Sequence, residues 1–222
     1  MRKKNYLKIL MLAGPLSVIL LLLPGFVLRM KAPEENLKSR YSYRDFESAK
    51  KCGSCHQGIY EQWSQALMSQ AYTHHWDEIE YFDLAVKHSE ADPALKEVVD
   101  GCNGCHTPVA FMGAREFPPP RPSANSMANE SVSCEACHLV QSAQTDPPFN
   151  FSYLIRPGMT KFAVREPAVE SPAHKIVTND FYKTTEFCGN CHNEKSPLDV
   201  WVKTTQIKWK EGPYDREGLH CQ

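Results

Sequence analysis

The residue types with the clearest chemistry in this sequence are cysteine and histidine, which occur together in one repeated pattern. Eight of the nine cysteines form Cys-x-x-Cys pairs, and a histidine follows each pair directly. The four copies are Cys52, Cys55 and His56; Cys102, Cys105 and His106; Cys134, Cys137 and His138; and Cys188, Cys191 and His192. The rest of the chain must position these thiol and imidazole groups.

The spacing within each copy indicates covalent attachment of haem c. In this chemistry two thiols add to the two vinyl groups of one porphyrin, and the adjoining histidine then ligates the iron. Four motifs therefore predict four haem c groups, attached through all eight paired cysteines. The proximal iron ligands are then His56, His106, His138 and His192.

Other uses of paired cysteines explain the pattern less well. A zinc site needs two Cys-x-x-Cys pairs, typically about 15–20 residues apart, and here the motifs begin at 52, 102, 134 and 188. A thioredoxin-like site needs one pair near a βαβ pattern. None of these uses, nor a disulfide framework, explains a histidine after every pair.

The N-terminal segment predicts a membrane anchor. Ile9 to Leu28 contains no charged residue, and its length of 20 residues matches a membrane span. A cleaved signal peptide usually has a shorter apolar core, so the pattern favours a retained single-pass helix within residues 1–30. The four preceding basic residues place the N-terminus in the cytoplasm, and we expect the haem domain on the periplasmic side of the inner membrane. These residues are Arg2, Lys3, Lys4 and Lys8.

The net charge of the chain indicates which classes of binding partner to expect. The formal net charge of the chain is −1, and four of its basic residues precede the apolar stretch, so the exported part is acidic. Nucleic acid is therefore not an expected partner. Redox proteins or quinol are the expected partners, and the sequence does not specify an oligomeric state.

The remaining pattern predicts a mainly α fold with extensive loops, short helices and little sheet. We expect helices over 59–75, 92–101 and 177–187, with Gly101 as a stop signal, and loops over 117–126 and 141–151. Residues 31–48 are polar and predict a spacer without core residues, and 49–222 form the haem domain. Each haem has fewer than 50 residues around it, so the haems must pack closely and supply much of the apolar core.

Five stretches of the sequence resemble the cytochrome c-554 family of multihaem cytochromes, whose haem arrangement is related to that of hydroxylamine oxidoreductase. The resemblance extends from Lys51 to the end of the chain. It is carried by CGSCHQGIYEQWSQALMSQA, CNGCHTP, SVSCEACH, SPAH and CGNCHNEKSP. The resemblance implies an electron-transfer protein with closely packed haems.

The last residues also resemble the family's lead-in to a further haem motif. Cys221 and Gln222 follow Glu217 in a pattern similar to Glu130, Cys134 and Glu135. We therefore expect a C-terminally truncated chain, with a fifth haem beyond residue 222. The alternative is a genuine terminus with an unpaired thiol.

Distal iron ligands are expected among the five other histidines, and His174 leads because SPAH resembles the family's Ser-Pro-x-His distal motif. His74 and His75 point about 100° apart on a helix, so they could serve two different haems. His88 is a further candidate, and His220 is left unassigned.

Met68 lies where the family pattern Trp-x-x-Ser-x-His places a distal histidine. A thioether can ligate haem iron, and a His/Met pair raises the reduction potential relative to two histidines. The alternative is that Met68 packs against porphyrin or protein, as flexible methionines commonly do.

The sequence thus predicts a membrane-anchored cytochrome that carries single electrons between redox partners, without catalytic residues of its own. Two alternatives are enzymatic: a quinol dehydrogenase, or a redox enzyme for small nitrogen species such as nitric oxide or hydroxylamine at a haem with an open coordination position. A third is a subunit of a conductive filament. The coordination state of each iron distinguishes the electron carrier from the enzyme.

Overall fold

The computed structural model describes residues 35–166, 170–219 and 221, and the expected membrane anchor and His220 lie outside these residues. Within the described residues no helix combines the length and apolar character that crossing a membrane requires. The described part belongs to one compact unit that begins at Glu34.

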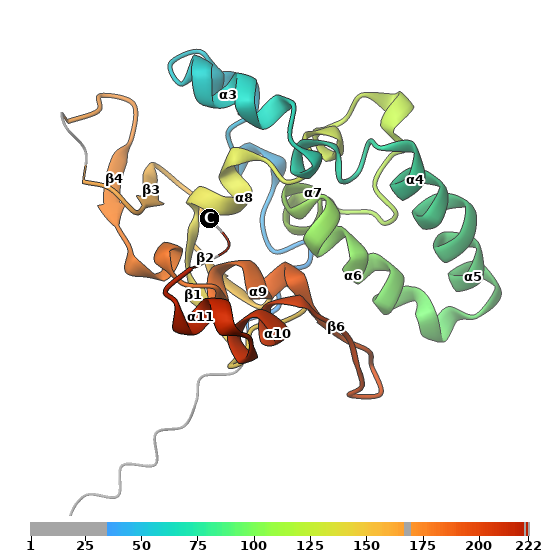
Figure 1. Ribbon diagram of the computed structural model, residues 1–222. Coiled ribbons are helices and arrows are strands. Elements are labelled where there is room, and N and C mark those ends of the chain that lie inside the picture. The colour runs from blue at the N-terminus through green and yellow to red at the C-terminus, as the bar shows by residue number, and fades with distance from the viewer. Residues whose placement is uncertain (1–34, 167–169, 220, 222) are drawn as a thin grey trace, which may run out of the picture. The chain divides into compact units, whose positions relative to one another are not determined.

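Short helices dominate this unit, as the sequence predicts (Figure 1). The helices are α2 (Ala49–Gly53), α3 (Gln57–Ser64), α4 (His75–Glu78), α5 (Val86–Ala91), α6 (Lys96–His106), α7 (Pro108–Gly113), α8 (Cys134–His138), α9 (Glu186–His192), α10 (Thr205–Glu211) and α11 (Pro213–Arg216). A π-helical stretch, Ile79–Ala85, joins α4 to α5. Short 3₁₀ turns span Tyr43–Asp45, Leu67–Gln70, Pro93–Leu95, Pro122–Ala124, Met127–Glu130 and Asp180–Lys183.

Sheet is limited to three two-stranded pairs in the described residues, in agreement with the expectation of little sheet. β1 (Val140–Ala143) pairs antiparallel with β2 (Tyr153–Ile155), and β5 (Asn193–Lys195) pairs antiparallel with β6 (Trp201–Thr204). β3 (Thr160–Ala163) and β4 (Lys175–Thr178) run parallel, with Lys161 opposite Ile176.

The expectation of one helix over 59–75 is wrong, because the helix ends at Ser64 and Ala66 is extended. Side chains compete for the carbonyls that a continuing helix would use. Both Ser64 Oγ and Gln65 Nε2 donate to the Glu61 carbonyl, and Ser69 Oγ donates to the carbonyls of Ser64 and Ala66.

Three other expected boundaries also differ. Gly101 does not stop the second helix, since α6 continues through it to His106. A mid-helix glycine costs only about 1 kcal/mol, and the buried side chains of Asp100 and Asn103 on either side hold this turn in place. The third expected helix begins as strand β4 and becomes α-helical at Glu186, and the expected loop over 141–151 begins within β1.

The expectation that 31–48 contributes nothing to the core is wrong for its described part. Leu37 and Phe46 are 3% and 7% exposed and belong to the main hydrophobic cluster. The backbone N–H groups of Ser39 and Tyr41 donate to carbonyls of Phe111 and Met112 at 2.9 Å. A few apolar residues in a polar stretch therefore suffice to pack this segment against α7.

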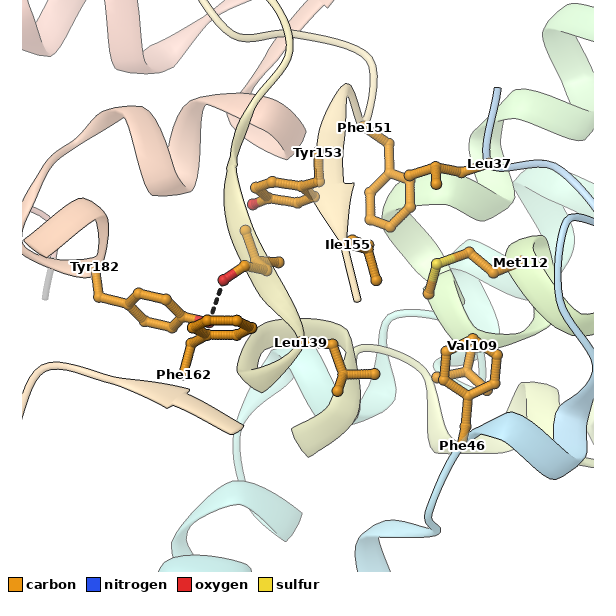
Figure 2. Packing of buried hydrophobic residues seen from close by; sticks show 11 residues of the cluster. Leu37, Phe46, Val109, Met112, Leu139, Phe151, Tyr153, Ile155, Phe162 and Tyr182 are labelled. Atoms are coloured by element: carbon orange, nitrogen blue, oxygen red, sulfur yellow. Dashed lines mark hydrogen bonds between the residues drawn. The ribbon is translucent and has the colours of Figure 1, made fainter. Parts of the chain in front are cut away.

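The main cluster joins segments that are far apart in the sequence (Figure 2). It contains Leu37, Phe46, Val109, Met112, Leu139, Val140, Phe151, Tyr153, Ile155, Phe162 and Tyr182. The Tyr182 hydroxyl donates to the Val140 carbonyl at 3.0 Å, the dashed line in Figure 2. A second cluster, Tyr72, Tyr81, Phe82, Val99, Ala110 and Ala128, lies beside α6.

Candidate haem-binding site

Each Cys-x-x-Cys-His motif lies on or at the end of a short helix. The second, third and fourth motifs occupy the last turns of α6, the whole of α8 and the end of α9, while the first runs from α2 to His56, the N-cap of α3. Positions i, i+3 and i+4 of a helix share one face. The helix geometry therefore places both thiols and the imidazole on one side in motifs two to four.

The middle residues of motifs two to four face the protein instead. Asn103, Glu135 and Asn190 are each at most 1% exposed. At Gly189 an added Cβ would lie 2.7 Å from Pro148 Cγ, which leaves no room for a larger residue. Packing on this side leaves the opposite face, which carries the cysteines and the histidine, for a ligand.

The fold brings the motifs together in pairs. The thiols of Cys52 and Cys134 are close enough that each shifts the pKa of the other, which joins motifs one and three. The thiols of Cys105 and Cys191 join motifs two and four in the same way. The Cys221 thiol likewise raises the pKa of Cys188.

Tyr153 connects these pairs. It is 5% exposed, its hydroxyl donates to the Phe187 carbonyl, and it is close enough to Cys191 to affect the pKa of that thiol. Burial raises the pKa of Tyr153, and nearby thiols of motifs two, three and four add to this shift. The motifs thus lie in the spatial order one, three, four, two.

Two of the histidines predicted as proximal ligands are oriented by backbone carbonyls. His106 Nδ1 lies 2.8 Å from the Ala71 carbonyl, and His138 Nδ1 lies 2.8 Å from the Phe162 carbonyl. A carbonyl only accepts, so Nδ1 carries the proton and Nε2 is left with its lone pair for a metal. Burial lowers the pKa of His192, which favours the neutral, ligating form of that imidazole as well.

His174 lies beside His56, at a separation that suits a distal ligand. The two ring centres are 6.1 Å apart and the rings are inclined by 29°. Two metal–nitrogen bonds of about 2.0 Å, plus ~1.2 Å from each nitrogen to its ring centre, give ~6.4 Å. His174 Nδ1 is buried without a hydrogen-bond partner among the described residues.

The other expected distal ligands are not brought opposite a proximal histidine in this way. His74 and His75 pack against each other with ring centres 5.1 Å apart, and His74 Nδ1 is 3.8 Å from Asp77. His88 is exposed on α5, and the side chain of Met68 is 56% exposed. In the described part of the chain, no further imidazole faces His106, His138 or His192 as His174 faces His56.

A pocket lies beside the second motif. Cys102, His106 and the aromatic residues Tyr72, Tyr81 and Phe82 line it, together with Ala71, Asp77, Glu78, Glu80, Ala85 and Asn103. Burial raises the pKa of both tyrosines, as expected for an apolar wall. The site thus offers two thiols for attachment, an imidazole nitrogen with a free lone pair and an aromatic wall. These groups together fit a covalently attached haem.

The sequence pattern did not predict the roles of several groups at the site. The carbonyls of Ala71 and Phe162 carry no side-chain information, and Tyr153 is separated from its neighbouring motif cysteines by 16 residues or more. Glu135 alone could have been noticed, because a carboxylate between two haem-attaching cysteines is unusual beside small and amide residues at that position in the other motifs.

Comparison with known proteins supports the same chemistry. Residues 51–139 match the family described as cytochrome c554 and c-prime, a range that includes the first three motifs. No curated protein and no solved structure matches the chain.

Proposed function

Since residues 51–139 identify this chain as a cytochrome c554-like c-type cytochrome, we propose that it carries single electrons between redox partners through four covalently attached haems. The observation that carries the proposal is the proximity of thiols from different motifs, which shift the pKa values of one another. This proximity supports one group of four proposed attachment sites, as transfer from haem to haem requires.

The proposed attachment residues are the eight paired cysteines, with His56, His106, His138 and His192 as proximal ligands and His174 as a distal ligand at the first motif. Bound haem supplies a one-electron couple between ferric and ferrous iron. The chain's own contribution is to hold each imidazole by its second nitrogen and to keep the attachment faces close together. His74, His75, His88 and Met68 are kept as candidates for the other distal positions.

The spatial order of the motifs indicates where the proposed electron-transfer route begins and ends. Motifs one and two are the outer members of the order one, three, four, two, so partners would dock near α3 and near α6. We further propose that the chain is held at the inner membrane through residues 1–30, with the haem domain in the periplasm. Quinol or a membrane protein would then reach one end, and a soluble redox protein the other.

A second candidate function is reduction or oxidation of a small nitrogen species at the second motif. The pocket beside Cys102 and His106 favours it, because it contains acidic residues that could move protons next to a metal ligand. This enzyme requires an iron with an open coordination position at His106.

Low-temperature electron paramagnetic resonance of the oxidised, haem-loaded chain, with and without nitric oxide, tests both functions. The electron carrier is expected to show only low-spin iron that nitric oxide leaves unchanged. A high-spin signal that disappears on adding nitric oxide would support the enzyme instead. Mass spectrometry of the same sample counts the haems, and fewer than four would contradict the attachment proposed here.

A further inference from the structure

Lys161 and Glu135 form an ion pair that joins β3 to the third motif. Lys161 Nζ lies 2.5 Å from Glu135 Oε1, and the two side chains are 15% and 2% exposed. Glu135 Oε2 has no hydrogen-bond partner among the described residues, so Lys161 is the main compensation for a buried carboxylate. Separating such a pair is unfavourable, because it leaves an uncompensated buried charge. The pair therefore resists any movement of β3 away from α8.

The two strands that Lys161 anchors also carry contacts to two iron ligands. The Phe162 carbonyl, one residue after Lys161, accepts from His138 of the third motif. β4 pairs in parallel with β3, and His174 directly precedes β4. The position of His174 thus follows the position of β3 (Figure 1, where β3 and β4 lie side by side).

The first motif is tied to the other side of α8. The Ala49 N–H donates to Glu130 Oε2 at 2.9 Å, just before α8, and the Cys52 thiol is close enough to Cys134 to shift its pKa. One path of contacts therefore runs from His56 through α2 to α8, and a second runs from α8 through β3 and β4 to His174. The ion pair is the side-chain link in the second path.

We propose that Lys161, through its ion pair with Glu135, is a positioning residue that keeps His174 opposite His56 and so maintains the sixth ligand of the iron at the first motif. The proposal rests on the proposed function, because it needs an iron at His56. Glu135, which belongs to the third motif, would thus help to maintain the coordination of the iron at the first motif.

The test uses the full haem-loaded chain and reads the spin state of the oxidised iron by electron paramagnetic resonance and optical spectroscopy. His174→Ala provides the reference spectrum for loss of the ligand, and we expect one low-spin haem to become high-spin. Lys161→Met keeps the length of the side chain but removes its charge, and we expect a new high-spin signal that matches the reference. Lys175→Met is the matched control on the exposed side of the same strands and should leave the spectrum unchanged.

The reversed pair, Glu135→Lys with Lys161→Glu, should restore the low-spin spectrum. If the iron site instead required a lysine at position 161, this double variant would remain high-spin. If Lys161→Met does not accumulate with its haems, Lys161→Gln supplies a neutral side chain that still donates a hydrogen bond, and the same high-spin signal is expected. A wild-type spectrum for Lys161→Met or Lys161→Gln, with a high-spin signal for His174→Ala, would overturn the inference and leave the proposed function intact. An unchanged spectrum for His174→Ala would overturn both the inference and the assignment of His174 as a ligand.

Discussion

At the scale of single residues, the second, third and fourth motifs are positioned by the residues between their cysteines. Those residues are small, or carry amides or a carboxylate, and they are buried against neighbouring segments. At Gly189 an added Cβ would lie 2.7 Å from Pro148 and 3.1 Å from Gln206. The attachment face of the fourth motif is therefore held in place from behind.

We predict that Gly189→Ala destabilises the haem-loaded chain by about 1–3 kcal/mol, because the added methyl group overpacks this contact. Urea unfolding monitored by haem absorbance measures the change. Gly58→Ala is the control, since Gly58 is also helical and an added Cβ there meets nothing within 4 Å. Equal stability of the two variants would show that the packing behind α9 is not tight.

At the scale of elements, Asn193 holds the start of α10 against the end of α9. It is 1% exposed, its Oδ1 accepts from the N–H groups of Gln206 and Ile207, and its Nδ2 donates to the Pro148 carbonyl and to Gln206 Oε1. A side chain distant in the sequence thus caps a helix whose own N-cap, Thr204, makes no side-chain cap. This network fixes the helix that follows the fourth motif.

We predict that Asn193→Ala lowers the free energy of unfolding by about 2–4 kcal/mol, because it leaves several buried polar groups unpaired. Chemical denaturation of the haem-loaded chain measures this loss. Asn193→Asp keeps the acceptor for α10 and should lose less, and Glu194→Ala at the exposed neighbouring position should have little effect. A loss for Asn193→Asp equal to that of Asn193→Ala would mean that the cap contributes nothing.

At the scale of the whole molecule, the segment before the first motif forms ion pairs with helix α6. Lys38 Nζ lies 2.8 Å from Asp100 Oδ2 and 2.9 Å from Glu97 Oε2, and the Asp100 side chain is only 4% exposed. Burial lowers the pKa of Lys38, but the hydrogen bonds and charges of Asp100 and Glu97 outweigh it and raise the pKa above 10.5. Lys38 therefore supplies a positive charge that compensates the buried Asp100 carboxylate on α6.

We predict that Lys38→Met costs about 1–3 kcal/mol of stability at neutral pH, because it leaves the Asp100 carboxylate buried beside fewer cations. A raised lysine pKa stabilises the fold below the unfolded value, and this contribution disappears as pH rises through the folded value. The difference between wild type and Lys38→Met should therefore shrink above pH 10.5. Unfolding titrations on either side of that pH measure it, with exposed Lys50→Met as the control, and a difference independent of pH would contradict the electrostatic explanation.

The attachment chemistry could be predicted from the sequence because it is local. Two cysteines and a histidine within five residues suffice for one haem, so assigning the cysteines and His56, His106, His138 and His192 used no knowledge of the fold and stays a prediction. The same pattern predicted short helices with little sheet, which the structure confirms. Helix boundaries were less predictable: side chains of Ser64, Gln65 and Ser69 end a helix that the apolar spacing would have continued.

The tertiary structure decided what depends on contacts between residues far apart in the chain. It pairs motif one with three and two with four, places His174 opposite His56, and packs Leu37 and Phe46 into a core that their polar surroundings did not indicate. Backbone carbonyls orient two of the histidines predicted as proximal ligands, and a carbonyl has no residue type that a sequence could reveal. Spacing along the chain determines how many haems can attach, whereas only the folding of separate segments onto one another determines which attachment sites become neighbours.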